Sequence, residues 1–314
     1  MNQPLISYII PTLNAEQYLK RCLDSIFMQD YPRDRYEVII ADGGSKDRTI
    51  EILKSYPVTY VHNEKHDAES GKYVAIQKAK GDIYVLLDSD NIIASKDWLT
   101  SLIQPLKENP DIVGVESNYL IANDFTSLNT YTNLLVIVDP LARMLAARPS
   151  KIDKKGTYIL KTFAQNSTPI SGANGFLWRK SVVEEYLRTN GKEFPEAKVL
   201  ADVAISGKVV YANVPGKGVY HYYCVSLNDY LKKRRKVAKN ILARKSRRED
   251  IWIEKGGKLR FYSSALYLTS FVGPLFEATY NFLKTGRKEW FWHPIVCFLT
   301  VWVYSLFFMS SHYE

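Results

Sequence analysis

Two aspartates in the first third of the chain follow a strand-like apolar run. Asp88-Ser89-Asp90-Asn91 comes directly after Ile83–Leu87, which reads IYVLL. Two carboxylates at positions i and i+2 of a loop at a strand end can share one divalent cation. A lone D-x-D pair is common, so the spacing alone leaves two interpretations open, a metal site and a solvated charge pair.

Asp42 ends a second apolar run in the same way. It follows Tyr36–Ala41 and precedes Gly43-Gly44. In a parallel sheet the carboxyl ends of neighbouring strands meet at one edge, where ligands bind. A carboxylate at that edge can accept hydrogen bonds from a nucleobase or a ribose. The alternative is an ordinary turn, because Asp-Gly-Gly-Ser is also typical turn chemistry.

The elements that must position these carboxylates alternate between strand and helix over about the first 120 residues. Apolar runs predict strands at Ile6–Ile10, Tyr36–Ala41, Val58–His62 and Ile83–Leu87. Helical periodicity predicts helices at Glu16–Asp30, Thr49–Tyr56, Lys72–Ala79 and Trp98–Lys107. This order predicts an α/β fold with a Rossmann-like, doubly wound, mostly parallel sheet. Further strands are expected at Ile112–Val115, Val209–Val214 and Gly218–Tyr223.

The composition excludes several classes of protein. The chain has 314 residues, of which 46% are hydrophobic and 24% charged, so a disordered or collagen-like chain is excluded. Its three cysteines are far apart, which argues against a disulfide framework or a structural zinc site. The net charge is +9, yet Lys232–Arg248 alone holds ten basic residues and no acid, which leaves −1 elsewhere. We therefore expect one local basic patch and no nucleic-acid partner.

Four motifs in chain order carry a resemblance to a known family. They are Ile9–Asn14 (IIPTLN), Ile39–Thr49 (IIADGGSKDRT), Ala79–Asp82 with Leu87–Asn91 (AKGD, LDSDN), and Ser171–Gly175 (SGANG) with Arg179. Together they resemble the family-two inverting glycosyltransferases of the GT-A fold. The resemblance covers roughly residues 5 to 235.

The resemblance implies a role for particular residues. It implies that the nucleotide is bound by Pro11, Leu13, Asp42, Lys72 and Asp88. It implies that the sugar and acceptor site is shaped by Gly172, Ala173, Asn174 and Gly175. Asp90 would ligate Mn²⁺ or Mg²⁺, which neutralises a diphosphate leaving group. His221 is either a second metal ligand, as in some GT-A enzymes, or a structural histidine among aromatic residues.

The chain departs from the family pattern at two places. The family often has Glu-Asp before the last core strands, with the Asp as general base, whereas this chain has Ala201-Asp202. Asp202 is the expected base for a hydroxyl acceptor, which needs one, while a phosphate acceptor is already ionised. The family's Gln-x-x-Arg-Trp is absent, and Arg234 and Arg235 are the expected substitutes at the diphosphate.

The C-terminal part predicts contact with a membrane. Phe261–Leu283 and Trp290–Met309 are apolar runs that would span ~34 and ~30 Å as helices. In the first, a polar stripe that includes Glu277 suits an interfacial helix or a helix packed against a partner, because Glu277 facing lipid in mid-bilayer would cost about 2.5 kcal/mol or more. A transmembrane hairpin and two interfacial helices both remain open, as do core helices. The basic patch favours anionic membrane lipids as partners.

These observations combine into one expectation with alternatives. We expect a GT-A domain at 1–230, a basic juxtamembrane segment at 231–258 and a membrane-associated helical hairpin at 259–314. The expected activity moves a sugar from a UDP- or GDP-sugar to a hydroxyl of a lipid-linked or membrane-proximal glycan. The start of the chain shows no signal peptide, so the expected location is the cytoplasmic face of the cell membrane. The alternatives are transfer to a polyprenyl phosphate, a non-catalytic membrane-bound nucleotide-sugar-binding protein and, less favoured, a nucleotidyltransferase.

Overall fold

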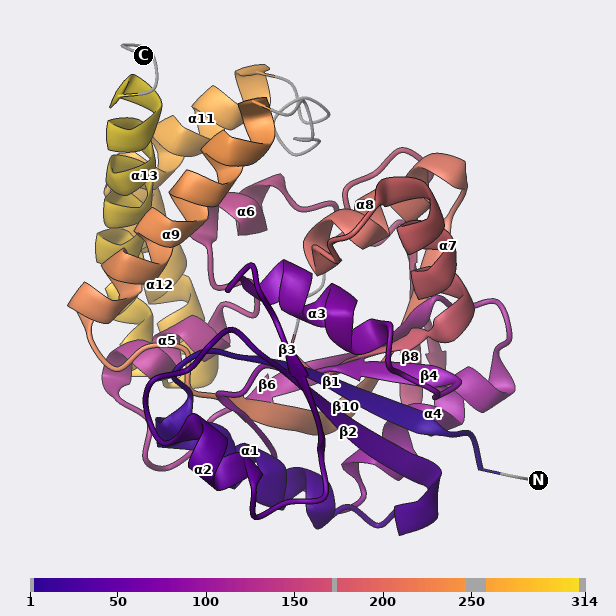
Figure 1. Ribbon diagram of the computed structural model, residues 1–314. Coiled ribbons are helices and arrows are strands. Elements are labelled where there is room, and N and C mark those ends of the chain that lie inside the picture. The colour runs from indigo at the N-terminus through magenta and orange to yellow at the C-terminus, as the bar shows by residue number, and fades with distance from the viewer. Residues whose placement is uncertain (1–2, 171–173, 247–257, 311–314) are drawn as a thin grey trace. The chain divides into compact units, whose positions relative to one another are not determined.

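The computed structural model describes residues 3–170, 174–246 and 258–310 (Figure 1). The chain forms two compact units. The first, here called the N-terminal unit, consists of Met1–Leu120 and Arg148–His221. The second, here called the helical unit, consists of Ile121–Ala147 and Tyr222–Glu314. The segment 121–147 thus belongs with the C-terminal helices and interrupts the N-terminal unit in sequence.

The first half of the N-terminal unit is a parallel sheet. Its strands are β1 (Ile6–Thr12), β2 (Tyr36–Asp42), β3 (Thr59–His62) and β4 (Ile83–Leu86), and β1 lies between β2 and β4. The helices that follow the first three strands are α1 (Glu16–Phe27), α2 (Thr49–Leu53) and α3 (Ala68–Ile76). Figure 1 shows α1 and α2 on one face of the sheet and α3 on the other. The predicted α/β fold is confirmed, with a doubly wound sheet that is parallel over these strands.

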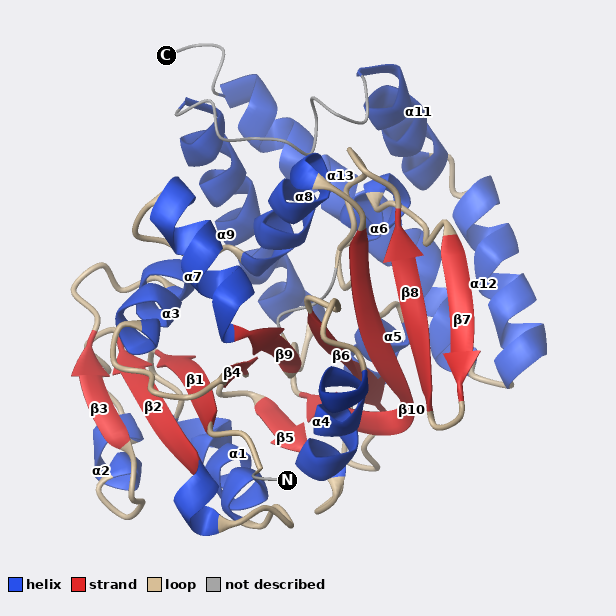
Figure 2. Ribbon diagram, turned by 90° about the vertical axis from the view of Figure 1, so that its right-hand side faces the viewer, coloured by secondary structure: helices blue, strands red, loops and turns tan. Residues whose placement is uncertain are grey.

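The second half of the sheet is mixed. Its elements are β5 (Asn91–Ile93), α4 (Trp98–Glu108), β6 (Gly114–Leu120), β7 (Lys151–Lys155), β8 (Tyr158–Phe163), β9 (Phe176–Arg179), α7 (Lys180–Asn190), α8 (Glu196–Ser206) and β10 (Val209–His221). The order is β3-β2-β1-β4-β9-β6-β10-β8-β7, and β5 pairs with β10 (Figure 2). The strand β9 runs antiparallel to both β4 and β6. A short 3-10 helix, η1 (Arg33–Arg35), precedes β2.

The two strands expected at 209–214 and 218–223 are one strand, β10. Its pairing with β6 shifts register between Asn213 and Gly218. The intervening Pro215 and Gly216 form an irregularity within the strand, a common place for these residue types. This continuity carries the chain to His221 at the strand's end.

The core of the N-terminal unit explains why the polar loops lie at the strand ends. Strand β1 is buried over almost its whole length, and α1 packs Leu19, Leu23 and Ile26 into the same core. These three residues recur at helical spacing, so they form one buried face. Along these strands, polar side chains that can meet a ligand therefore lie at the strand ends and in the loops that follow them.

The helical unit contains no strand among its described residues. Its helices are α5 (Ser127–Leu134), α6 (Pro140–Leu145), α9 (Leu227–Ser246), α11 (Lys258–Thr269), α12 (Val272–Thr285), the 3-10 helix η2 (Lys288–Trp292) and α13 (His293–Ser310). Its buried side chains include Tyr131, Tyr230 and Trp290 in one cluster and Leu268, Cys297 and Tyr304 in another.

The first apolar run was expected as one helix and is two. α11 ends at Thr269, and α12 begins at Val272 after Phe271, whose φ is 59°. Pro274 explains the break, because in a continuous helix its ring would clash with the carbonyl of Ser270. Neither half is long enough to cross a bilayer by itself, since 14 residues of helix rise about 21 Å.

One stretch within the described residues is long and apolar enough to cross a membrane. It is Lys288–Phe307, and half of its apolar stretch is buried within the protein. The basic segment Lys232–Arg248 is described only as far as Ser246, the end of α9.

Candidate functional site

The predicted ligand-binding residues gather at the carboxyl edge of the parallel strands. Thr12 and Asp42 are paired in the register of β1 and β2, which brings Pro11 and Leu13 beside the Asp42 loop. Asp88 and Asp90 follow β4, which flanks β1 on its other side. Leu13 is exposed, while Pro11 is half-buried and lies under Gly71 of α3. This edge of the sheet thus holds two apolar side chains, Pro11 and Leu13, together with three aspartates.

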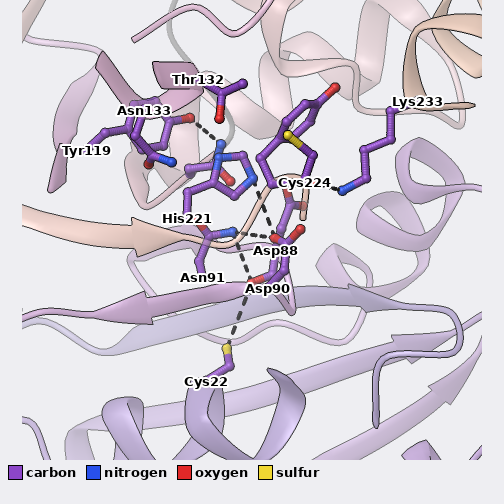
Figure 3. A network of polar contacts seen from close by, with 12 residues as sticks. Cys22, Asp88, Asp90, Asn91, Tyr119, Thr132, Asn133, His221, Cys224 and Lys233 are labelled. Atoms are coloured by element: carbon purple, nitrogen blue, oxygen red, sulfur yellow. Dashed lines mark hydrogen bonds and ion pairs between the residues drawn. The ribbon is translucent and has the colours of Figure 1, made fainter. Parts of the chain in front are cut away.

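His221 reaches the Asp90 loop through strand pairing. Asn91 of β5 is the register partner of His221 on β10, although 130 positions separate them in sequence. As a result His221 Nε2 lies 3.6 Å from Asp90 Oδ1 (Figure 3). The Asn91 side chain donates to the Asp88 carbonyl (3.2 Å) and to Asp90 Oδ1 (3.0 Å), which holds the loop. The ring of Tyr119 stacks on His221 with centroids 5.4 Å apart.

The donor set at Asp90 and His221 suits a divalent cation bound together with a ligand. No cluster of three or more His, Cys, Asp or Glu side chains that could hold a metal occurs within the described ranges. The pair offers one carboxylate and one imidazole, and 26% of the Asp90 side chain is accessible. Mg²⁺ is commonly held by one or two carboxylates plus substrate phosphates and water, and imidazole is a normal ligand of transition metals. The residues present fit such a shared site.

Asp42 organises its own loop. Its side chain is fully buried, and Oδ1 accepts from the hydroxyls of Thr12 (2.9 Å) and Ser45 (2.5 Å). Oδ2 accepts from the backbone N–H groups of Gly44 and Ser45, both at 2.8 Å. An ionised carboxylate has about four acceptor positions, and these four donors use them. In this structure Asp42 therefore fixes the loop that would hold a base.

Lys72 has a partner that the sequence analysis missed. Both Lys72 and Glu196 are buried, and Lys72 Nζ lies 3.4 Å from Glu196 Oε2. Burial lowers the pKa of Lys72, but the carboxylates of Glu196, Asp88 and Glu69 outweigh burial and raise that pKa to about 12. Burial raises the pKa of Glu196 to about 7, against the influence of Lys72 and with that of Asp88. The only signal in the sequence was an acid beside Pro195 at a helix start.

Asp202 lies on α8, the same helix as Glu196. It forms an ion pair with Lys198, one turn earlier, at 3.0 Å, and the side chains of both are mostly buried. This helix runs from Glu196 to Ser206, so Asp202 lies well inside it.

The glycine-containing loop is described in part. Gly172 and Ala173 lie outside the described residues. The Asn174 amide donates to the Tyr119 hydroxyl, which links it to the ring stacked on His221. Gly175 has φ of 75°, and an added Cβ would lie 3.0 Å from the Trp98 ring, so a side chain there would be strained and crowded.

Arg234 and Arg235 belong to the helical unit. Arg234 is buried and pairs with Asp139 at 2.7 Å, and it also donates to the Tyr223 hydroxyl. These are the contacts of a structural ion pair, so little of this guanidinium is left for a diphosphate. Arg235 is exposed on α9.

Comparison with known proteins covers the part of the chain that carries the loops after β1, β2 and β4. Residues 7–187 match the model of the family described as glycosyl transferase family 2. A relative from Methanococcus voltae is 27% identical over 212 residues, which make up 63% of this chain and 56% of that protein. It is named dolichyl N-acetyl-α-D-glucosaminyl phosphate 3-β-D-2,3-diacetamido-2,3-dideoxy-β-D-glucuronosyltransferase. The match thus spans little more than half the length of this relative.

Two further similarities cover more of both chains. The glycosyltransferase GlyG of Streptococcus pneumoniae is 28% identical over 224 residues, 67% of this chain and 68% of that protein. Among solved structures, the mannosyltransferase PcManGT of Pyrobaculum calidifontis, in complex with GDP-Man and Mn²⁺, superposes with a TM-score of 0.58. That likeness covers 97% of this chain and 88% of the other at 18% identity, and it shows a shared fold.

Proposed function

Because the chain belongs to glycosyl transferase family 2, a family of inverting glycosyltransferases, we propose that it transfers a sugar with inversion from a nucleoside diphosphate sugar to a membrane-proximal acceptor. The observation that carries the proposal is the carboxyl edge of the sheet. Asp42 is the last residue of β2 and Asp88 follows β4, and both strands pair with β1. Asp90 lies 3.6 Å from His221. Open α/β sheets bind their ligands at this edge.

The nucleoside diphosphate sugar is proposed to bind to the loops after β1, β2 and β4. Pro11 and Leu13 offer an apolar surface to a base, and Asp42 keeps its loop in shape through Thr12 and Ser45. Lys72, which stays protonated among carboxylates, supplies a positive charge near Asp88. The PcManGT complex supports a GDP-sugar as one donor class, and UDP-sugars remain the other.

Asp90 and His221 are the proposed metal-binding pair. When bound there, Mn²⁺ or Mg²⁺ would neutralise negative charge that develops on the departing diphosphate. Asn91 keeps the Asp90 carboxylate in place through its 3.0 Å hydrogen bond. His221 is held by its stack on Tyr119, which fixes the direction of the imidazole.

Asp202 remains the proposed general base for a hydroxyl acceptor. It would accept the proton of that hydroxyl as the bond to the anomeric carbon forms, while the bond to the diphosphate breaks. Its ion pair with Lys198, at 3.0 Å, holds the carboxylate on α8. Glu196, buried against Lys72, is assigned the role of holding that lysine in place.

The proposed acceptor is a lipid-linked or membrane-proximal glycan on the cytoplasmic face of the membrane. The name of the Methanococcus relative gives a dolichyl-linked sugar as its acceptor, which supports a lipid-linked one here. A polyprenyl phosphate is the alternative acceptor, and for it Asp202 would matter little because a phosphate is already ionised.

One experiment tests the activity. The protein is incubated with UDP-, GDP- and dTDP-sugars, membrane lipid extract and Mn²⁺ or Mg²⁺, and released nucleotide and glycosylated lipid are measured by mass spectrometry. We expect nucleoside diphosphate from one donor, dependence on the cation, and a loss of at least 100-fold in Asp90→Asn. Release of pyrophosphate would indicate a nucleotidyltransferase, and donor binding without turnover would indicate a binding protein. Either result contradicts the proposal.

A further inference from the structure

The helices α11 and α12 turn their apolar side chains outward. On α12, Val272, Leu275, Phe276, Tyr280 and Leu283 are exposed, with Phe276 79% and Leu283 77% accessible. On α11 the exposed residues are Leu259, Tyr262 and Leu266. Within each helix these residues follow one another at spacings of one, three or four positions, which places each set on one face of its helix. We call these eight side chains the outer apolar face.

The one acidic side chain of α12, Glu277, points the other way. Glu277 forms ion pairs with Arg143 of α6 (2.6 Å) and with His293 of α13 (3.3 Å), inside the helical unit. Pro274 and Ala278, on the same side, are buried. Within the polar stripe that the sequence shows, Pro274 and Glu277 therefore face inward on this helix. This is the reverse of what a helix on a water-exposed surface requires.

An apolar face of this extent needs an apolar medium. Monomeric soluble proteins rarely expose contiguous apolar patches of more than a few hundred Å², and larger ones mark contact with a partner or a membrane. Phe276 and Leu283 on α12 and Leu259 on α11 each expose more than three quarters of their surface.

Charge decides between the possible occupants. Exposed basic residues flank the outer apolar face at Arg260, Lys284, Arg287 and Lys288. The acids on α11, α12 and η2 are Glu277, which is paired inward, and Glu289. Apolar and aromatic side chains edged by Lys and Arg are the composition of an interfacial helix on anionic lipid. Two copies of this face brought together would instead place like charges near one another.

The packing of α13 argues that the helical unit does not cross the bilayer. α13 lies along α9, where Tyr230 bonds Thr300 at 2.8 Å and Arg234 approaches Tyr304 at 3.5 Å. The rest of α9 exposes the cations Lys232, Arg235, Lys236 and Lys239. A spanning α13 would take these charges into hydrocarbon or lose its contacts with α9. Half of the candidate span is also already buried within the protein.

We propose that the outer apolar face of α11 and α12 inserts into one leaflet of an anionic membrane, so that the helical unit lies on the bilayer and α13 is a core helix. This deepens the membrane attachment in the proposed function and decides between the interfacial and transmembrane alternatives. Lipid binding is measurable without donor or acceptor, so a failure here is distinct from a failure of the transfer activity.

The test uses the full-length chain and vesicles of phosphatidylcholine with 30 mol% phosphatidylglycerol. Flotation gives the partition of the protein, and we expect Leu275→Glu/Phe276→Glu to lower it at least 10-fold. The matched control is Ile152→Glu, an equally exposed apolar position on β7 of the N-terminal unit, which should leave partition unchanged. Circular dichroism and the melting temperature of each variant show that it is folded. Loss of partition in the control as well would contradict the proposal.

A fluorophore attached to an introduced cysteine reports how deeply a helix enters the bilayer and which helix stays in water. The native cysteines are buried and free, and the unsubstituted chain measures their background labelling. With vesicles, a probe at Phe276→Cys should be quenched by lipids with a shallow spin label, whereas a probe at Lys236→Cys should stay open to iodide in water. Loss of iodide quenching at 236 would indicate a spanning arrangement. The protein could also form a dimer without lipid, lose that dimer in the double variant and fail to bind vesicles. That result would assign the outer apolar face to contact with a second copy of the chain. Either outcome overturns the proposal.

Discussion

At the scale of single residues, Asp202 distinguishes between the two acceptor classes. Asp202→Asn keeps the size and hydrogen bonding of the side chain but cannot accept a proton. General-base catalysis contributes about 10²–10⁴-fold, so for a hydroxyl acceptor we expect kcat to fall by that range while donor affinity is unchanged. Single-turnover kinetics and donor titration measure the two quantities. A fall in kcat of less than ~10-fold would indicate that the acceptor is a lipid phosphate.

Glu196 gives the stability of the fold a pH dependence. Because burial and Asp88 raise its pKa from 4.5 to about 7 despite Lys72, the folded chain keeps a proton on Glu196 that the unfolded chain releases above pH 4.5. The resulting stability is complete below about pH 4.5 and is lost as pH rises to about 7. Linkage sets the sign: the free energy of unfolding falls as pH rises through this range.

Glu196→Gln should remove this slope. Urea unfolding of the wild type and the variant at pH values from 5 to 8 gives the free energy of unfolding at each pH. The charged groups that influence Glu196 are Lys72, Asp88 and Glu69, and they are unchanged in the variant. Glu185→Gln is the control, since Glu185 is an exposed partner of Arg188 on α7 and should leave the slope as it was. The same slope in Glu196→Gln and the wild type would refute the assignment.

At the scale of elements, the position of His221 depends on how closely β10 approaches β6. A Cβ on Gly218 would lie 2.3 Å from the carbonyl oxygen of Asn118 on β6. Gly218→Ala should therefore push the strands apart, three residues before His221, at a cost of about 1–3 kcal/mol. We expect a lower melting temperature and a several-fold weaker Mn²⁺ activation.

Gly207→Ala is the matched control for this strand. Position 207 precedes β10, its φ of 176° is extended backbone, and an added Cβ there meets nothing within 4 Å. It should leave both the melting temperature and the Mn²⁺ dependence unchanged. If Gly218→Ala behaves like this control, the β6–β10 contact does not set the position of His221.

The elements also show how far sequence patterns reach. The strands β1, β2 and β4 are continuous apolar runs, so periodicity found them and the loops that carry Asp42, Asp88 and Asp90. The contact between Lys72 and Glu196 joins residues 124 positions apart, and no local pattern encodes such a pairing.

The two faces of α12 were visible in the sequence, but which face points inward was not. That direction depends on Arg143 and His293, which meet Glu277 only in the folded helical unit. Similarly, the break between α11 and α12 has a local cause in Pro274, yet the apolar composition on both sides made the run look continuous.

At the scale of the whole molecule, our proposals assign one ligand to each of the two units. The donor is expected to bind loops of the N-terminal unit, while lipid is expected to bind α11 and α12 of the helical unit. Amide hydrogen exchange can separate these effects, because a ligand slows exchange only where opening abolishes its binding. The amides of Gly44 and Ser45, which donate to Asp42, lie in one of the donor loops.

Two exchange measurements on the full-length protein test this division. With GDP or UDP and Mn²⁺ at about 100 times Kd, amides that exchange through opening of the loops at 42–45 and 88–91 should slow by up to ~100-fold. With anionic vesicles and no nucleotide, protection should instead appear at α11 and α12. Asp90→Asn should weaken the first effect and leave the second intact, since Asp90 belongs to the N-terminal unit. If nucleotide and vesicles protect the same peptides, the two sites are not separate, and donor binding and membrane attachment would have to be assigned to one surface.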